Sequence, residues 1–282
     1  TYQNLENEEL LWVASMPCTM GSEEIPLARY GDSNIGLLKT LYRRGLSHRY
    51  GSVMQTVAGI HYNFSMPDSF WPLYKDICKS SASIQDFRTE KYLHLIRNFH
   101  RYSWLLLYLF GASPAVCKCF VSGRKHRLQK YDEYNLYMPH ATCLRMGDLG
   151  YSSDAQKSLF VCYNELETYA ECLDRAMHTP YPDYEKIGLR KDDEFLQINT
   201  SLLQLENEFY STVRPKRTAK PGQRPLEALT EDGIEYVEVR ALDLNPFLPL
   251  GIDSEQIRFL DSFLLYCLLS ESPECNEQEY FE

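Results

Sequence analysis

The pattern of apolar and polar positions predicts long helices separated by extended segments. Ser33 or Asn34 can cap a helix in which apolar residues recur every three to four positions, and Gly51 is a suitable stop. The same recurrence predicts further helices over about 84–110, 154–177 and 254–270. Gly111 with Pro114 follows the first of these segments, and Thr179 with Pro180 and Pro182 follows the second.

Two other segments alternate with a period of two, which predicts strands. Residues 53–64 place one set of side chains on an apolar face (Met54, Ile60, Tyr62, Phe64) and another on a polar face (Gln55, His61, Asn63). In residues 234–240, Glu238 and Arg240 share a face, whereas Glu235 lies on the other. Half-buried strands are usually poor in charge. Two polar strand faces therefore predict one shared pocket, and a salt bridge at a sheet surface is the simpler alternative for Glu238 and Arg240.

The remaining long segments have no regular period. Residues 121–135 are predicted to form an exposed loop, 195–213 extended or irregular chain, and 214–225 a basic loop. The chain has no internal repeat and no low-complexity tract. These patterns predict α and β elements interlocked in one domain.

Composition narrows the classes of function. The 282 residues, of which 44% are hydrophobic, are enough to fill a sizeable core. A formal net charge of -10 argues against nucleic acid as the main partner. The longest apolar run, at 104–110, is far shorter than the roughly 20 residues that span a bilayer. We therefore expect a buried helix there and no membrane segment.

The nine cysteines indicate a reducing, cytoplasmic setting, because their number is odd and no secretory segment opens the chain. Cys117 and Cys119 are two positions apart, which is too close for the usual zinc site. We expect them to be buried as small hydrophobic side chains, with metal binding as the alternative.

Several polar residues are suited to phosphate chemistry. A carboxylate such as Glu238 is a ligand that Mg²⁺ prefers, and the guanidinium of Arg240 can bind phosphate oxygens. His61 is a less usual Mg²⁺ ligand, and a structural role is its alternative. Arg145, on a glycine-containing loop, can hold a substrate carboxylate, or can lie exposed on a solvated turn.

Any nucleotide site in this chain must lack the common glycine-rich phosphate-binding loops. The block RPKR at 214–217 is either a loop that faces phosphate or a nucleic-acid patch. The sequence contains neither GxxxxGK[ST] nor GxGxxG, so the common phosphate-binding loops are absent from it.

Five stretches together resemble one family: LARYGDSNIGLLKTLYRRGLSHRYGSVMQTVAGIHYNFSMP, YLFGASPAVC, ATCLRMGDLGYSS, LQINTSLLQLENEFYSTVRPKR and GIEYVEVRALDLNPF. They resemble the bacterial glutamate–cysteine ligases of the proteobacterial type, in the same order from near residue 12 to near residue 270. The resemblance implies an α+β fold related to glutamine synthetase. In that fold a curved antiparallel sheet forms a funnel-shaped active site and helices pack outside it.

The resemblance also implies the first reaction of glutathione synthesis. ATP, the co-substrate, phosphorylates the γ-carboxylate of L-glutamate, and the amine of L-cysteine then displaces phosphate from the acyl phosphate. The family uses Mg²⁺, with Mn²⁺ as an alternative ion. Such a transfer needs metal ions and cationic side chains that neutralise the shifting charge.

Site residues follow from the resemblance by position. His61 and Glu238 are expected at the metal, Arg240 near the transferred phosphoryl group, and Arg145 at the substrate or intermediate. Gln55 and Asn63 are expected around glutamate. The cysteine pocket is expected to contain Tyr42, Leu46, Tyr151 and Tyr210.

Family members begin well before the counterpart of Thr1 and continue past Glu282. Residues 1–282 are therefore expected to form a single catalytic-domain fragment that lacks some acidic metal ligands. The expected partners are L-glutamate, L-cysteine and ATP, with neither nucleic acid nor membrane, and the sequence leaves monomer and oligomer open. Two alternatives are a glutamate–amine ligase with another acceptor and a non-catalytic remnant that binds a ligand or a partner chain.

Overall fold

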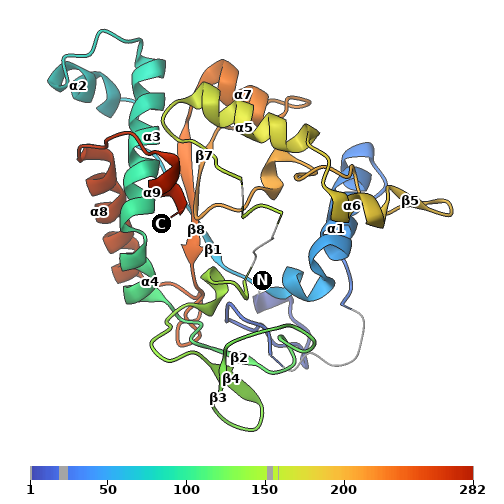
Figure 1. Ribbon diagram of the computed structural model, residues 1–282. Coiled ribbons are helices and arrows are strands. Elements are labelled where there is room, and N and C mark those ends of the chain that lie inside the picture. Colours follow the sequence, from blue (N-terminus) through green and yellow to red (C-terminus); the bar gives the residue numbers. More distant parts are fainter. Residues whose placement is uncertain (1, 19–24, 151–154, 158, 282) are drawn as a thin grey trace.

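A three-stranded antiparallel sheet lies at the centre of the molecule (Figure 1). The computed structural model describes residues 2–18, 25–150, 155–157 and 159–281. The strand order is β1 (Ile60–Phe64), β8 (Tyr236–Leu242) and β7 (Val213–Lys216). The smaller sheets contain β2 (Ala115–Cys117), β4 (Asn135–Tyr137) and β3 (Gln129–Lys130), and β5 (Arg190–Lys191) with β6 (Glu194–Phe195). Helices with antiparallel sheets confirm the predicted α+β class.

Helices cover the central sheet on one side and face it across a cavity on the other. Figure 1 shows α3 (Ile84–Tyr102) and α8 (Ser254–Leu269) beside the sheet, and α1 (Asn34–Tyr50) on the opposite side. The other helices are α2 (Phe70–Ile77), α4 (Trp104–Phe110), α5 (Leu166–His178), α6 (Pro182–Ile187), α7 (Pro225–Asp232) and α9 (Glu277–Phe281). Short 3₁₀ helices are η1 (Tyr2–Asn4), η2 (Ser52–Thr56), η3 (Leu144–Met146) and η4 (Glu206–Glu208).

Alternation along β8 separates the core from a polar face. Val237 and Val239 are fully buried in the main hydrophobic cluster with side chains of α3 and α8. Glu238 lies on the other face, directly opposite Asn63 of β1 and Arg214 of β7 in the register. Residues that pair across antiparallel strands share a face. The sheet thus gathers polar side chains from three strands on one surface.

Several predicted boundaries are wrong. Residues 53–64 do not form one strand, because Gly51 (φ 83°) ends α1 and the following chain turns as η2, with the Met54 amide donating to the Gly51 carbonyl. The helix predicted over 84–110 is divided at Ser103 into α3 and α4. In the part of 154–177 that the structure describes, the helix begins only at Leu166.

Two segments that the sequence predicts as loops contain strands in the structure. Residues 214–216 belong to β7, although the sequence predicts a basic loop from 214. Pro215 is accommodated because β7 is the edge strand of the sheet, where a missing N–H is tolerated. The predicted loop at 121–135 contains β3. The N-cap prediction for α1 is confirmed, since Ser33 Oγ accepts from the Gly36 amide at 3.1 Å.

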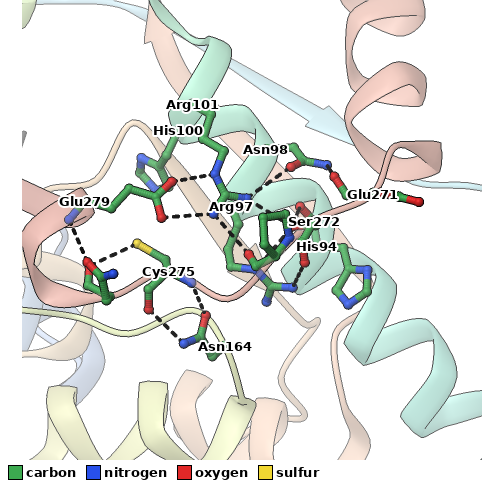
Figure 2. A network of polar contacts seen from close by, with 12 residues as sticks. His94, Arg97, Asn98, His100, Arg101, Asn164, Glu271, Ser272, Cys275 and Glu279 are labelled. Atoms are coloured by element: carbon green, nitrogen blue, oxygen red, sulfur yellow. Dashed lines mark hydrogen bonds and ion pairs between the residues drawn. The ribbon is translucent and has the colours of Figure 1, made fainter.

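Polar contacts fasten the segment that follows α8 to α3 (Figure 2). Buried Arg97 donates from Nη1 to the carbonyl of Tyr163 (2.8 Å) and from Nη2 to that of Ser272 (3.0 Å). Asn98 Nδ2 donates to the Cys267 carbonyl at 2.9 Å, and Arg101 pairs with Glu279 at 2.5 Å. Of these bonds, those to the Cys267 and Ser272 carbonyls satisfy groups at and beyond the C-terminus of α8 that have no partner within the helix.

No helix in the described ranges is both long and apolar enough to cross a bilayer.

Candidate active site

A cavity of about 480 Å³ lies on the polar face of the central sheet. Its walls come from α1, residues 55–61, Arg145, residues 207–210, β7 and β8. The predicted residues that line it are Tyr42, Leu46, Gln55, His61, Arg145, Tyr210, Glu238 and Arg240. The structure therefore brings most of the predicted site residues together.

His61, Glu238 and Arg240 lie in direct contact at the sheet. His61 Nδ1 is 3.7 Å from Glu238 Oε2, and Arg240 Nε donates to His61 Nε2 at 3.2 Å. Burial and the positive charge of Arg240 lower the pKa of His61. The imidazole is therefore neutral at neutral pH, and the neutral ring is the form that can bind a metal ion.

His61 and Glu238 fit part of a metal site. No group of three His, Cys, Asp or Glu side chains is arranged around a metal position in the described chain. Mg²⁺, however, is commonly held by one or two carboxylates together with substrate phosphates and water. The two adjacent donors are compatible with such shared coordination and do not form a complete protein cage.

Arg145 is held rigidly at the end of the cavity. It is buried, and its Nε donates to Asp243 Oδ1 at 2.7 Å. Asp243 Oδ2 accepts in turn from Ser113 Oγ at 2.6 Å. A Cβ atom at Gly59 would lie 2.8 Å from Arg145 Nη1, so glycine is needed for this close approach. The alternative of an exposed arginine on a solvated turn is wrong.

Two cationic residues of β7 belong to the block RPKR, for which a phosphate-facing loop was one predicted alternative, although neither was assigned individually to the site. Arg214 and Lys216 alternate along the strand and line the cavity beside Glu238. Burial, followed by the charge of Arg240, lowers the pKa of Arg214 to about 10. Within the described residues, Arg214 Nε and Arg240 Nη1 are buried without a hydrogen-bond partner. Unpaired buried donors are costly, so an anionic ligand that accepts hydrogen bonds from these two groups would be favoured.

A buried ion pair attaches α1 to the opposite wall. Glu208 accepts from Arg49 Nη1 at 3.1 Å and from the Tyr50 hydroxyl at 2.6 Å. Its other oxygen accepts from the Gln204 amide at 2.6 Å. Because Tyr42 and Leu46 belong to the same helix, Glu208 fixes the wall that they form. Periodicity gave no signal for Glu208, which lies in the segment predicted to be irregular.

For three predicted site residues, the structure does not match the predicted position or does not describe it. Asn63 shares the face of Glu238 but is exposed and does not line the cavity. Gln55 lines it from η2 rather than from a strand, and its Nε2 donates to the Arg43 carbonyl at 3.1 Å. Tyr151 lies outside the described residues.

Comparison with known proteins gives a consistent result over the whole chain. The model of the glutamate-cysteine ligase family matches residues 1–282. Proteins named glutamate–cysteine ligase from Hahella chejuensis and Alcanivorax borkumensis are 53% identical over 279 residues and 55% identical over 273 residues. These matches cover 99% and 95% of this chain but 53% and 52% of those proteins. The chain thus spans about half the length of the curated relatives it matches.

Solved structures show the same fold. A glutamate–cysteine ligase of Francisella tularensis in complex with AMP matches with a TM-score of 0.90 and 39% identity, over 98% of this chain and 54% of that one. A bifunctional glutathione synthetase of Pasteurella multocida matches with a TM-score of 0.72 and 27% identity, over 99% of this chain and 31% of that one. Together with the sequence matches, these likenesses show that the chain belongs to the glutamate–cysteine ligase family.

Proposed function

We propose that this cavity serves the ATP-dependent joining of the γ-carboxylate of L-glutamate to the amine of L-cysteine, through a γ-glutamyl phosphate. Family membership supports the reaction class. The observation that carries the proposal is the charge of the cavity, whose lining includes five cationic side chains (Arg43, Arg145, Arg214, Lys216 and Arg240). The carboxylates of the lining are Glu208, which Arg49 balances, and Glu238. Asp243 balances Arg145 from outside the lining, so four cationic side chains remain against Glu238. Such an excess of positive charge suits a substrate pair with phosphate and carboxylate groups.

Each cationic group has a task in this reaction. A carboxylate is a poor electrophile until it is phosphorylated, and phosphoryl transfer is assisted mainly by positioning and charge neutralisation. We assign Arg240 to the transferred phosphoryl group, and Arg145 to the substrate or the acyl phosphate. Arg214 and Lys216 are placed to hold further phosphate oxygens of ATP.

A divalent ion, Mg²⁺ with Mn²⁺ as an alternative, would supply additional charge neutralisation when bound. His61 and Glu238 are the residues that would hold it, together with phosphate oxygens of ATP. We further propose that residues 1–282 form the central part of one catalytic domain. The remainder of a protein as long as the relatives would contribute the other ligands.

Among the lining residues, Gln55 is assigned to glutamate, and Tyr42, Leu46 and Tyr210 are assigned to cysteine. Asn63, which is exposed outside the cavity lining, is given no role in this cavity. Once the acyl phosphate has formed, the amine of cysteine attacks its carbonyl carbon and phosphate leaves. The AMP complex of the Francisella structure supports nucleotide binding in this family.

Phosphate release tests the proposal. The assay contains ATP, Mg²⁺ and glutamate, with and without cysteine, and uses both the 282-residue chain and a chain extended to the length of the relatives. We expect cysteine-dependent release from the extended chain. Release with another amine but not with cysteine would assign a different acceptor, and no amine-dependent release at all would contradict ligase activity.

A further inference from the structure

Cys117 and Cys119 form a pair of thiols away from the cavity. Their Sγ atoms are 2.8 Å apart, and both residues are half-buried rather than fully buried as the sequence predicts. The turn after β2 produces this proximity, since the Phe120 amide donates to the Cys117 carbonyl at 3.0 Å and the Val121 amide to the Lys118 carbonyl at 3.3 Å. The backbone thus presents both side chains on one side of the turn.

The surrounding segment is strongly basic. Residues 118–133 contain Lys118, Arg124, Lys125, Arg127 and Lys130 against Asp132 and Glu133, which leaves an excess of positive charge. Neighbouring positive charge favours the thiolate, which is the reactive form of cysteine. It also attracts anionic reagents at low ionic strength.

We propose that Cys117 and Cys119 form a thiol–disulfide exchange site for a carboxylate-bearing, low-molecular-weight disulfide. One thiolate attacks a sulfur of the small disulfide, which forms a mixed disulfide and releases one small thiolate. The second cysteine then attacks the protein sulfur of that mixed disulfide and expels the other small thiolate. Two electrons pass from the cysteines to the small disulfide, and the protons of the two thiols are taken up by the two small thiolates that leave.

The geometry favours the second step. A disulfide has an S–S bond of about 2.05 Å, so the two sulfurs need to approach by only roughly 0.8 Å. A resolving thiol already in place makes the mixed disulfide short-lived. This inference does not depend on the ligase proposal, because neither cysteine lines the cavity.

Oxidation of the 282-residue chain with glutathione disulfide tests the site. Intact mass and peptide mapping without reductant should show the loss of two hydrogens and a bond between Cys117 and Cys119. Cys119→Ser should instead accumulate a glutathione adduct on Cys117. Cys78→Ser, which removes a single exposed cysteine, should behave like the parent chain.

The salt dependence of the oxidation rate tests whether the basic segment favours an anionic disulfide. The rate of oxidation by glutathione disulfide should fall about tenfold between low and high salt, whereas the rate with uncharged 2-hydroxyethyl disulfide should change little. Equal salt dependence of the two reagents would overturn the anionic preference. Stable adducts on Cys117 or Cys119 of the parent chain, or oxidation confined to other cysteines, would overturn the paired site itself.

Discussion

At the scale of single residues, β8 separates charges that are close in sequence. Glu238 and Arg240 face the cavity, whereas Glu235 precedes the strand and accepts from the Thr218 amide at 2.9 Å. That bond lowers the pKa of Glu235 and gives it a local structural role. The three residues therefore provide a matched set for testing the site.

Removing either cavity charge should reduce turnover strongly. In the extended chain we expect Glu238→Gln and Arg240→Ala each to lower the rate of ligation by about 100-fold, the scale of losing one preorganised electrostatic group. Glu235→Gln is the control and should keep the parental rate. ADP release at saturating substrates measures the effect, and a near-normal rate in either cavity variant would place the chemistry elsewhere.

Lys216 should contribute mainly to nucleotide binding. It is half-buried beside Glu238, and burial lowers the pKa of its amine. Lys216→Met removes one charged donor, so the KM for ATP should rise about tenfold with a smaller change in kcat.

Lys220→Met is the matched control for Lys216. Lys220 lies in the same basic stretch, but it is exposed and pairs with Asp232 at 3.6 Å. Equal KM values for ATP in the two variants would remove Lys216 from the phosphate site.

The site was only partly predictable at this scale. Period-two alternation placed Glu238 beside Arg240, and the family resemblance added Arg145 and the tyrosines. Arg214 and Lys216 were predicted only as part of a block that could face phosphate, because their basic, proline-containing sequence resembles a loop. Their position in the site depends on pairing with β8, which brings Val213 opposite Val239 and Lys216 opposite Tyr236, and strand register is not encoded in local sequence.

At the scale of elements, the position of α1 depends on the pair between Arg49 and Glu208. Both side chains are almost fully buried, at 0% and 1% exposure. Arg49 also donates to Gln197 Oε1 at 2.9 Å and lies over the ring of Tyr184. Removing one partner of such a pair leaves an uncompensated buried charge.

Glu208→Gln should therefore destabilise the fold and loosen the wall of α1 that we propose to bind cysteine. We expect a loss of about 3–5 kcal/mol in the free energy of unfolding, measured with urea. Where the variant folds in the extended chain, its KM for cysteine should rise more than its KM for ATP, because Tyr42 and Leu46 move with α1.

Another ion pair of α1 provides the control. Glu194→Gln removes a pair with Arg44 that is 3.6 Å long and largely exposed, so it should change stability little. If the two variants lost equal stability, the buried pair would not be the element that fixes α1.

The order of the long elements was predicted well, but their boundaries were less accurate, and the shorter α2, α6, α7 and β2 to β7 were not predicted. The caps of α1 and the alternation of β8 are local signals, which explains their success. The segment 159–163 failed because Val161 and Tyr163 fill the core from chain without regular structure. Tertiary packing there overrides the helical spacing of apolar residues.

At the scale of the whole molecule, histidines with lowered pKa values link stability to pH. The pKa of half-buried His94 is lowered to about 4, mainly by its partial burial, and the pKa of His61 is lowered as well. An unfolded histidine titrates near 6.5. Between about pH 4 and 6.5 the unfolded chain therefore binds more protons than the folded one, so stability falls as pH falls through this window.

His94→Gln tests how much His94 contributes to the pH dependence of the free energy of unfolding. His94 is half-buried on α3, and Lys91 and Arg97 add to the effect of burial on its pKa. Urea unfolding of the parent chain should show a free energy that decreases from pH 6.5 to pH 5, a range above the ordinary titration of carboxylates. The variant should lose less stability over the same range, because glutamine takes up no proton. Parallel pH profiles for the two chains would show that His94 titrates alike in the folded and unfolded states.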